Sequence, residues 1–156
     1  MLAAIVVACS ASLPSRVVDA GVPGAAIVPL DDDLAVAARV SGQQVEVVGF
    51  VRVGDAWTAT VIGGSSLQPG GANSVHLFGW EGEGEGEWGW WNSFAYGTAA
   101  ASVSRVVLDG LAGEGGRVVG GAWVIAIRAA GVQPRDLRWR FLDAAGAVVT
   151  AGTGIQ

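Results

Sequence analysis

The chain has 156 residues, of which 51% are hydrophobic and only 15% are charged. This composition fits one globular domain with a buried core and excludes a disordered chain or a charged coiled coil. The net charge of −5 argues against nucleic acid as a partner, because binding phosphates requires a basic footprint. No window reaches the roughly 18–20 apolar residues that a membrane-spanning helix needs, so we expect no transmembrane helix.

The first residues resemble the end of a bacterial lipoprotein signal. Cys9 is the only cysteine, and it follows an apolar run that ends in Val6-Val7-Ala8. In such a signal the chain is cleaved before the cysteine and the thiol is lipidated, so this interpretation predicts membrane attachment through Cys9. A basic n-region is missing, and the h-region of such a signal has at least about seven apolar residues, which this segment barely reaches. The alternative is an ordinary apolar N-terminus, and the sequence leaves both open.

We divide the chain into residues 1–33, an apolar start followed by a Pro/Ala-rich linker, and residues 34–156, a single β domain. Pro14, Pro23 and Pro29 exclude a helix longer than two turns from the linker. A lipidated Cys9 would make this segment a tether. Without lipidation we expect an edge strand at residues 25–30.

From residue 34 onward, short apolar or alternating segments recur about every ten residues, with Gly, Asp, Ser and Pro between them. We expect no helix longer than a turn or two, and glycine-rich loops at residues 63–73 and 109–116. The spacing predicts an all-β fold, an immunoglobulin-like β-sandwich of roughly nine short antiparallel strands. The expected strands are residues 34–40, 44–53, 57–62, 74–80, 88–96, 102–108, 117–119, 122–128, 137–141 and 148–150.

Two of these segments have a distinctive pattern. Residues 122–128 are apolar at successive positions up to the final arginine, so both faces are apolar, which is typical of a central strand between packed layers. In the last hairpin, Leu137, Trp139 and Phe141 alternate with arginines, so we expect Trp139 in the core. The turn at residues 143–146 places Gly146 where a positive φ is needed.

Four stretches of the second half resemble a group of uncharacterised exported proteins of actinobacteria, and they cover roughly the C-terminal 60 residues. In that group a string of Gly-x-Ala-Pro, Val-x-Leu-x-Asp-Gly and Asp-x-x-Gly-x-Val runs through an immunoglobulin-like β-sandwich. The resemblance implies this fold and export from the cell, and it implies no catalytic residue. The matching stretches are Ala95-Tyr96-Gly97-Thr98-Ala99, Val103 to Gly110, Gly121-Ala122-Trp123-Val124 and Phe141 to Val149.

Chemistry-bearing residues are sparse. His76 is the only histidine, and either it is a general base beside a serine or it is a packed residue of a strand. The second interpretation is favoured, because no Gly-x-Ser-x-Gly elbow is present and a triad needs three groups together. One histidine and one cysteine do not make a four-ligand zinc site, so we expect no metal and no cofactor.

Two acidic runs have the same pair of interpretations. Glu81, Glu83, Glu85 and Glu87 alternate with glycine, and Asp31-Asp32-Asp33 ends the linker. Each run either attracts Ca²⁺ or a basic partner, or is a solvated turn. Calcium sites need about six to eight oxygens held in place, and glycine at every second position opposes that order. We therefore favour the solvated turn.

The aromatic residues around the glutamates are the strongest candidate for a binding site. In a strand Trp88 and Trp90 share one face, while Trp91 lies on the other, and Trp80 precedes the glutamates. Rows of flat rings stack on sugars in carbohydrate-binding modules, and aromatic residues also anchor protein interfaces. The other interpretation, which we favour for most of these rings, is that they fill the core, and we then expect at least one tryptophan to be exposed.

The sequence thus predicts a non-enzymatic, secreted or cell-surface interaction module without a cofactor. Its partner would be an unknown protein or polysaccharide and not nucleic acid. A first alternative is a carbohydrate-binding module that uses the tryptophans at 80, 88, 90 and 91. A second alternative is a hydrolase whose site the sequence does not reveal.

Overall fold

The computed structural model describes residues 5–8, 25–30, 32–54, 56–66, 73–78, 94–109, 115–127 and 137–154. This part of the chain is all-β and contains no helix, as predicted. Within these ranges twelve strands form three antiparallel sheets. Their bounds are β1 Ile5–Ala8, β2 Ala26–Pro29, β3 Leu34–Ser41, β4 Gln44–Val53, β5 Ala56–Ser66, β6 His76–Phe78, β7 Phe94–Thr98, β8 Arg105–Asp109, β9 Gly115–Arg117, β10 Ala122–Ala126, β11 Arg138–Leu142 and β12 Val148–Thr153.

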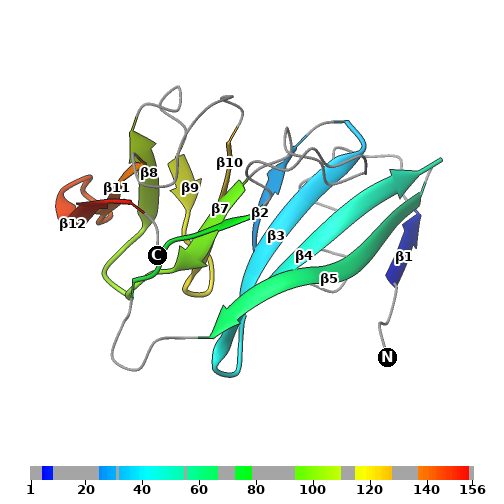
Figure 1. Cartoon of the computed structure of the whole chain (residues 1–156), viewed down its shortest axis with the longest axis horizontal. Coiled ribbons are helices and arrows are strands. Elements are labelled where there is room, and N and C mark those ends of the chain that lie inside the picture. The colour runs from blue at the N-terminus through cyan, green and yellow to red at the C-terminus, as the bar shows by residue number, and fades with distance from the viewer. Residues whose placement is uncertain are drawn as a thin grey trace.

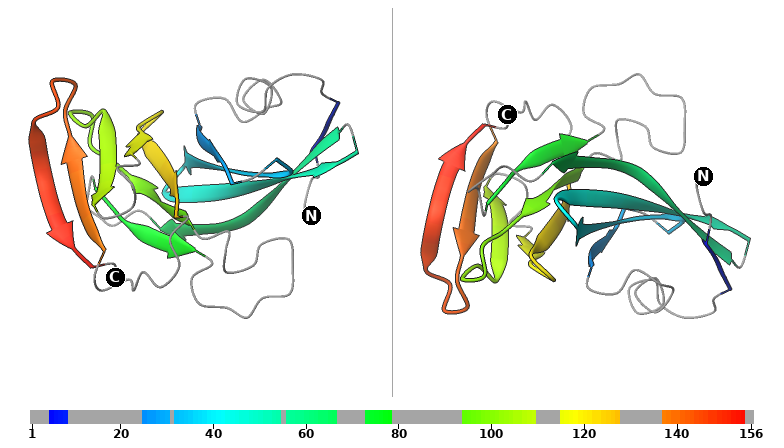
Figure 2. Two further views of the ribbon diagram at one scale, coloured as in Figure 1. Left: turned by 90° about the horizontal axis from the view of Figure 1, so that it is seen from above. Right: turned by 90° about the horizontal axis from the view of Figure 1, so that it is seen from below.

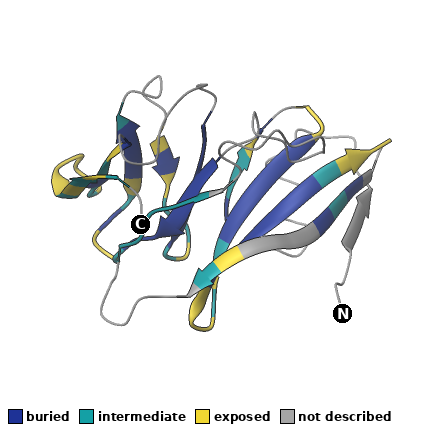
Figure 3. Cartoon of the chain, viewed as in Figure 1, coloured by how far each residue is buried: buried dark blue, intermediate teal, exposed yellow. Residues whose placement is uncertain are grey.

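The three sheets follow one another along the long axis of the molecule (Figures 1 and 2). Sheet A has the strand order β1-β5-β4-β3-β2, sheet B the order β10-β7-β6 and sheet C the order β12-β11-β8-β9. Sheet B is the middle layer. Both β7 and β10 are buried along their whole length (Figure 3).

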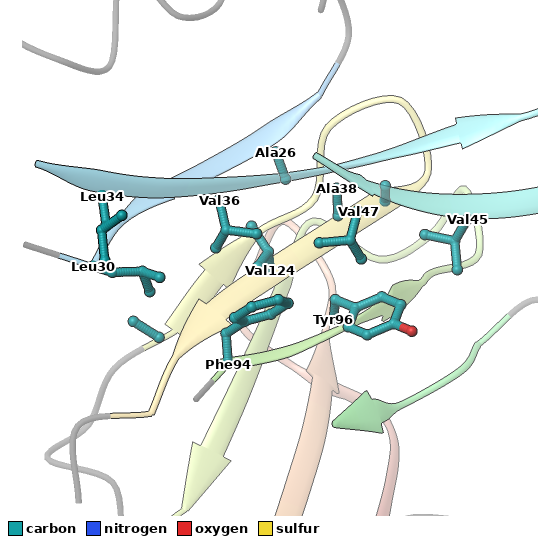
Figure 4. Packing of buried hydrophobic residues seen from close by; sticks show 12 residues of the cluster. Ala26, Leu30, Leu34, Val36, Ala38, Val45, Val47, Phe94, Tyr96 and Val124 are labelled. Atoms are coloured by element: carbon teal, nitrogen blue, oxygen red, sulfur yellow. The ribbon is translucent and has the colours of Figure 1, made fainter. Parts of the chain in front are cut away.

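One face of sheet B packs against sheet A. Phe94, Tyr96 and Val124 of sheet B meet Val36 and Val47 of sheet A in a continuous apolar cluster. Figure 4 shows these side chains between the two layers of strands. Alternate residues of a strand point to opposite faces, so the residues between them are free to face sheet C.

The other face of sheet B packs against sheet C. Ala95, Trp123 and Ile125 of sheet B lie in a second cluster with Leu108 and Phe141 of sheet C. Trp123 is fully buried, its ring meets Phe141 edge to face with centroids 6.0 Å apart, and its indole N–H donates to the Thr98 carbonyl at 3.2 Å. The prediction that residues 122–128 contain a strand buried on both faces between packed layers is confirmed for Ala122–Ala126. The expected central position is wrong, because β10 is an end strand of sheet B.

Sheet A is also buried on its second face. Ala35, Ala37, Val48, Phe50 and Trp57 form a third cluster there. The antiparallel meander of β3, β4 and β5 positions these side chains. The predicted strand at residues 44–53 is confirmed, and both of its ends agree with β4.

The last hairpin agrees with its prediction. Leu137 and Phe141 are buried, Arg138 is exposed, and Gly146 has a φ of +82°. Trp139 packs at the margin of the second cluster, so it belongs to the core face as expected but is only partly buried.

Several boundaries differ from the prediction. Residues 63–66 continue β5, where we expected a loop, because a register shift opposite Val47 and Val48 lets the ladder resume. β8 begins at Arg105, three residues later than expected, since residues 101 and 102 form a turn. The strand count exceeds roughly nine, partly because β1 and β2 lie within the predicted linker and pair with β5 and β3. The division at residue 33 stays a prediction.

Candidate functional site

The predicted binding residues lie outside the described ranges. Trp80, Trp88, Trp90 and Trp91 fall within residues 79–93, and Cys9 falls within residues 9–24. The aromatic platform and the lipid attachment site therefore stay predictions. Trp57, by contrast, is buried in the third cluster, on the second face of sheet A.

His76 begins β6 and pairs with Tyr96 of β7. Its ring stacks at a tilt on the Tyr96 ring with centroids 5.3 Å apart. The Nε2 atom is buried without a hydrogen-bond partner, and burial lowers the pKa of the imidazole from its ordinary 6.5. A general base would have to hydrogen-bond a nucleophile, so this environment favours the interpretation of His76 as a packed strand residue.

A groove lies where an edge strand of each of the three sheets meets the other two. It has a volume of about 500 Å³ and is lined by β2, β9 and β10 and by Val119. These three strands are the end strands of sheets A, C and B, respectively. The lining residues that the structure describes are Ala25, Ala26, Ile27, Val28, Gly115, Gly116, Arg117, Val119, Val124, Ile125 and Ala126.

The hydrogen-bond alternation shows which backbone groups face this groove. Ala99 N–H donates to the Gly121 carbonyl across the β7–β10 ladder. In an antiparallel pair, hydrogen-bonded and non-hydrogen-bonded residues alternate. Trp123 and Ile125 therefore bond to β7, while Val124 and Ala126 direct their N–H and C=O groups away from it, toward the open edge. Within the described ranges no further strand pairs with that edge.

The same reasoning places open backbone groups on β2. Leu30 N–H donates to the Leu34 carbonyl, which fixes the alternation in the β2–β3 ladder. Ile27 therefore points its N–H and C=O away from β3. The groove thus combines aliphatic side chains with backbone donors and acceptors from at least two strand edges.

Gly116 allows β9 to come close to the groove floor. A Cβ added at this position would lie 2.7 Å from Ile125 Cγ1 and 2.8 Å from the Val124 carbonyl oxygen. Only glycine accepts such an approach. The backbone of β9 therefore packs directly on β10 and forms one wall of the groove.

The site was not visible in the sequence. The sequence predicts a loop at residues 109–116, whereas Gly115 and Gly116 belong to β9. The strand at residues 25–30 was expected only in the absence of a lipid anchor, whereas β2 lines the groove. The useful sequence signal was the Gly115-Gly116 pair beside an arginine, since paired glycines in a strand mark a close backbone approach.

The described residues supply few groups for metal or cofactor chemistry. Within them no three His, Cys, Asp or Glu side chains gather as metal ligands. The described ranges also contain no helix long and apolar enough to span a membrane. Comparisons with family models, with curated proteins and with solved structures found no match to the chain.

Proposed function

We propose that the protein is a non-enzymatic interaction module, exported and held at the cell surface, that binds an extended segment of a partner protein. The segment would add as a strand to the open edge of β10. The observation that carries this proposal is the groove lined by three sheet edges, with the Val124 N–H and the Ala126 backbone groups directed into it. The export component rests on the sequence around Cys9.

Strand addition suits the chemistry of this groove. Main-chain hydrogen bonds supply affinity in this mode of recognition, and pockets for alternate side chains supply specificity. The lining offers open N–H and C=O groups together with small aliphatic side chains. We therefore expect the bound segment to carry small apolar residues at every second position.

We further propose that β6–β12 form an immunoglobulin-like sandwich. Sheets B and C together have seven antiparallel strands, three in one sheet and four in the other, as in the smaller members of that architecture. Their facing sides share the cluster around Trp123 and Phe141. Sheet A would then be an added layer on the outer face of the sandwich.

A selected peptide library tests the proposed function. Display of random 12-residue peptides against the full chain would recover binders, whose dissociation constants are then measured by fluorescence polarisation. Val119 lines the groove, and Val119→Trp fills it while keeping the backbone bonds to Ala122. Val53→Trp is the matched control, because Val53 is 67% exposed and lies outside the groove.

We expect Val119→Trp to weaken peptide binding by about tenfold or more, and Val53→Trp to leave it unchanged. N-methylation of alternate peptide residues should abolish binding, because it removes the donors that a ladder needs. Binders that tolerate both changes, or recovery of no binder, would refute strand addition. Binding of soluble xylan or glucan in place of peptides would favour the carbohydrate-binding alternative.

A further inference from the structure

The outer face of sheet C carries four of the nine arginines of the chain. Residues directly opposite one another on paired strands share a face. Arg138 stands opposite Asp109, Arg140 opposite Val107, and Leu142 opposite Arg105. Arg105 in turn stands opposite Arg117 of β9. This face is opposite to the one that packs on sheet B, which holds Leu108 and Phe141.

The four arginines form a diagonal stripe across the sheet, which we call the arginine stripe. It runs from Arg138 to Arg140 along β11, then to Arg105 on β8 and to Arg117 on β9. Neighbours along a strand on one face are about 6.7 Å apart, and diagonal neighbours are about 7–8 Å apart. The stripe therefore presents positive charge at intervals of about 7 Å from Arg138 to Arg105, and it ends at Arg117, which stands directly opposite Arg105.

Within the described residues, the positive charge of the arginine stripe is poorly neutralised by carboxylates. Asp109 binds Arg140 through two nitrogens at 2.7 and 3.1 Å, and the described ranges show no carboxylate paired with the other three arginines. Val118 N–H donates to the Ser104 carbonyl, so Arg105 and Arg117 form a non-hydrogen-bonded pair with Cα atoms about 4.5 Å apart. Like charges placed directly opposite are destabilising.

The position of Arg105 adds a second observation. A Cβ added at Gly115 would lie 2.5 Å from Arg105 Nε and 3.0 Å from its Cζ. The guanidinium thus lies over the glycine, on the surface of the sheet, where a larger residue would displace it. The chain therefore places the positive charges of Arg105 and Arg117 side by side, and Gly115 leaves room for the guanidinium group of Arg105. Such a local conflict is typical of functional sites.

We propose that the arginine stripe binds an extended acidic peptide with a carboxylate at every second residue. In an extended chain such carboxylates lie on one side, about 6.7 Å apart, which is close to the spacing from Arg138 to Arg140 and on to Arg105. Planar guanidinium groups bind carboxylates through two parallel bonds, and Arg140 with Asp109 already shows this geometry on the stripe.

An acidic peptide fits this molecule better than a denser polyanion. The net charge of −5 repels a long uniformly charged polymer from the surface around the stripe, whereas a short peptide needs to touch only the stripe. This inference goes beyond the proposed function and does not depend on it. Arg105 and Arg138 are themselves outside the groove lining, although the Arg105 guanidinium group lies over Gly115, which lines it.

A labelled octapeptide of four Glu-Gly repeats is a suitable probe, because the chain itself carries this alternation at residues 81–87. The matched control peptide has Gln in place of Glu. Titrations by fluorescence polarisation use the full chain and, in parallel, a variant with Glu81→Gln and the same change at 83, 85 and 87. That variant removes the chain's own carboxylates as competitors.

We expect the Glu peptide to bind and the Gln peptide not to bind. Raising salt from about 50 to about 300 mM should weaken binding severalfold, because exposed charges are screened. The double variant Arg105→Gln with Arg138→Gln should weaken it about tenfold or more. Arg52→Gln is the control, since Arg52 is an exposed arginine of sheet A whose guanidinium group donates to the Gly54 carbonyl. This variant should bind the probe like the unchanged chain.

Three results would overturn the proposal. One is the absence of Glu-peptide binding to both the full chain and the variant without the four glutamates. Another is equal binding by the double arginine variant. The third is preferential binding of a heparin-derived oligosaccharide at the stripe, which would make the partner a sulfated polysaccharide.

Discussion

Substitutions at Gly152 and Trp139, which contact each other, test the packing of sheet C. The two residues stand opposite each other on β12 and β11. A Cβ added at Gly152 would meet Cη2 of Trp139 at 2.6 Å, and it would come still closer to Cζ2. The indole N–H donates to the Gly154 carbonyl at 3.0 Å, and the ring meets Phe141 edge to face with centroids 5.4 Å apart. Gly152→Ala therefore displaces the indole from a hydrogen bond and an aromatic contact.

The expected magnitude follows from opposing effects. Overpacking a fitted site costs about 1–3 kcal/mol. Replacing glycine by alanine returns about 0.4–1 kcal/mol, because the unfolded chain loses conformational freedom. We expect Gly152→Ala to lower the free energy of unfolding by about 1–2 kcal/mol. Trp139→Ala should cost about 2–4 kcal/mol, somewhat less than a fully buried ring would, since Trp139 is only partly buried.

A double-mutant cycle supplies the control. With Trp139→Ala in place, an alanine at position 152 meets no ring, so its cost should vanish or become slightly favourable. The free energies of unfolding of the four proteins, measured by urea titration with far-ultraviolet circular dichroism, should then show a coupling of about 1–2 kcal/mol. Additive effects within about 0.5 kcal/mol would mean that the indole does not lie over Gly152, and the reasoning would fail.

Three further predictions concern other parts of the molecule. Trp123→Phe should lower the free energy of unfolding by about 1–2 kcal/mol, because it removes the buried N–H bond to Thr98 and some ring volume; an unchanged urea midpoint would contradict this burial. Burial lowers the pKa of His76 below its ordinary 6.5, so the unfolded chain binds the proton more readily than the folded chain. The free energy of unfolding should therefore fall as the pH drops below about 6.5. His76→Gln should flatten this pH dependence, measured as the urea midpoint. Asp143→Ala removes bonds from the Ala145 and Ala147 N–H groups to the Asp143 carboxylate and should lower the thermal midpoint by a few degrees; an unaltered midpoint would show that the turn does not need them.

The sequence predicted best what local alternation determines. The hairpin of β11 and β12 follows from the alternation of Leu137, Trp139 and Phe141 with arginines, and from a turn sequence that ends in glycine. The strands β3 and β4 likewise agree with their predicted ranges, and only the end of β3 differs, by one residue. In the hairpin, neighbouring residues alone specify which side faces the core.

The groove and the arginine stripe depend on pairings between distant segments, which periodicity does not report. Arg105 and Arg117 come together only because β9 pairs with β8, and residues 109–116 gave no strand pattern. The outward direction of Arg138 and Arg140 was predictable, but the strand that would stand beside them was not. The sheet edges around the groove similarly come from residues nearly a hundred positions apart.

The layer order explains why binding should concentrate at an edge and on sheet C. β7 and β10 have side chains buried on both faces, so these two strands can offer a partner only the backbone edge of β10, which lies in the groove. The two central strands β3 and β4 of sheet A are largely buried on both faces as well. The outer face of sheet C is the one broad sheet face in the described ranges that carries several arginines. A chain with only 15% charged residues would not place four arginines on one face for solubility alone, because interspersed charges of both signs serve solubility better. The concentration of arginines there is what a charged ligand would require.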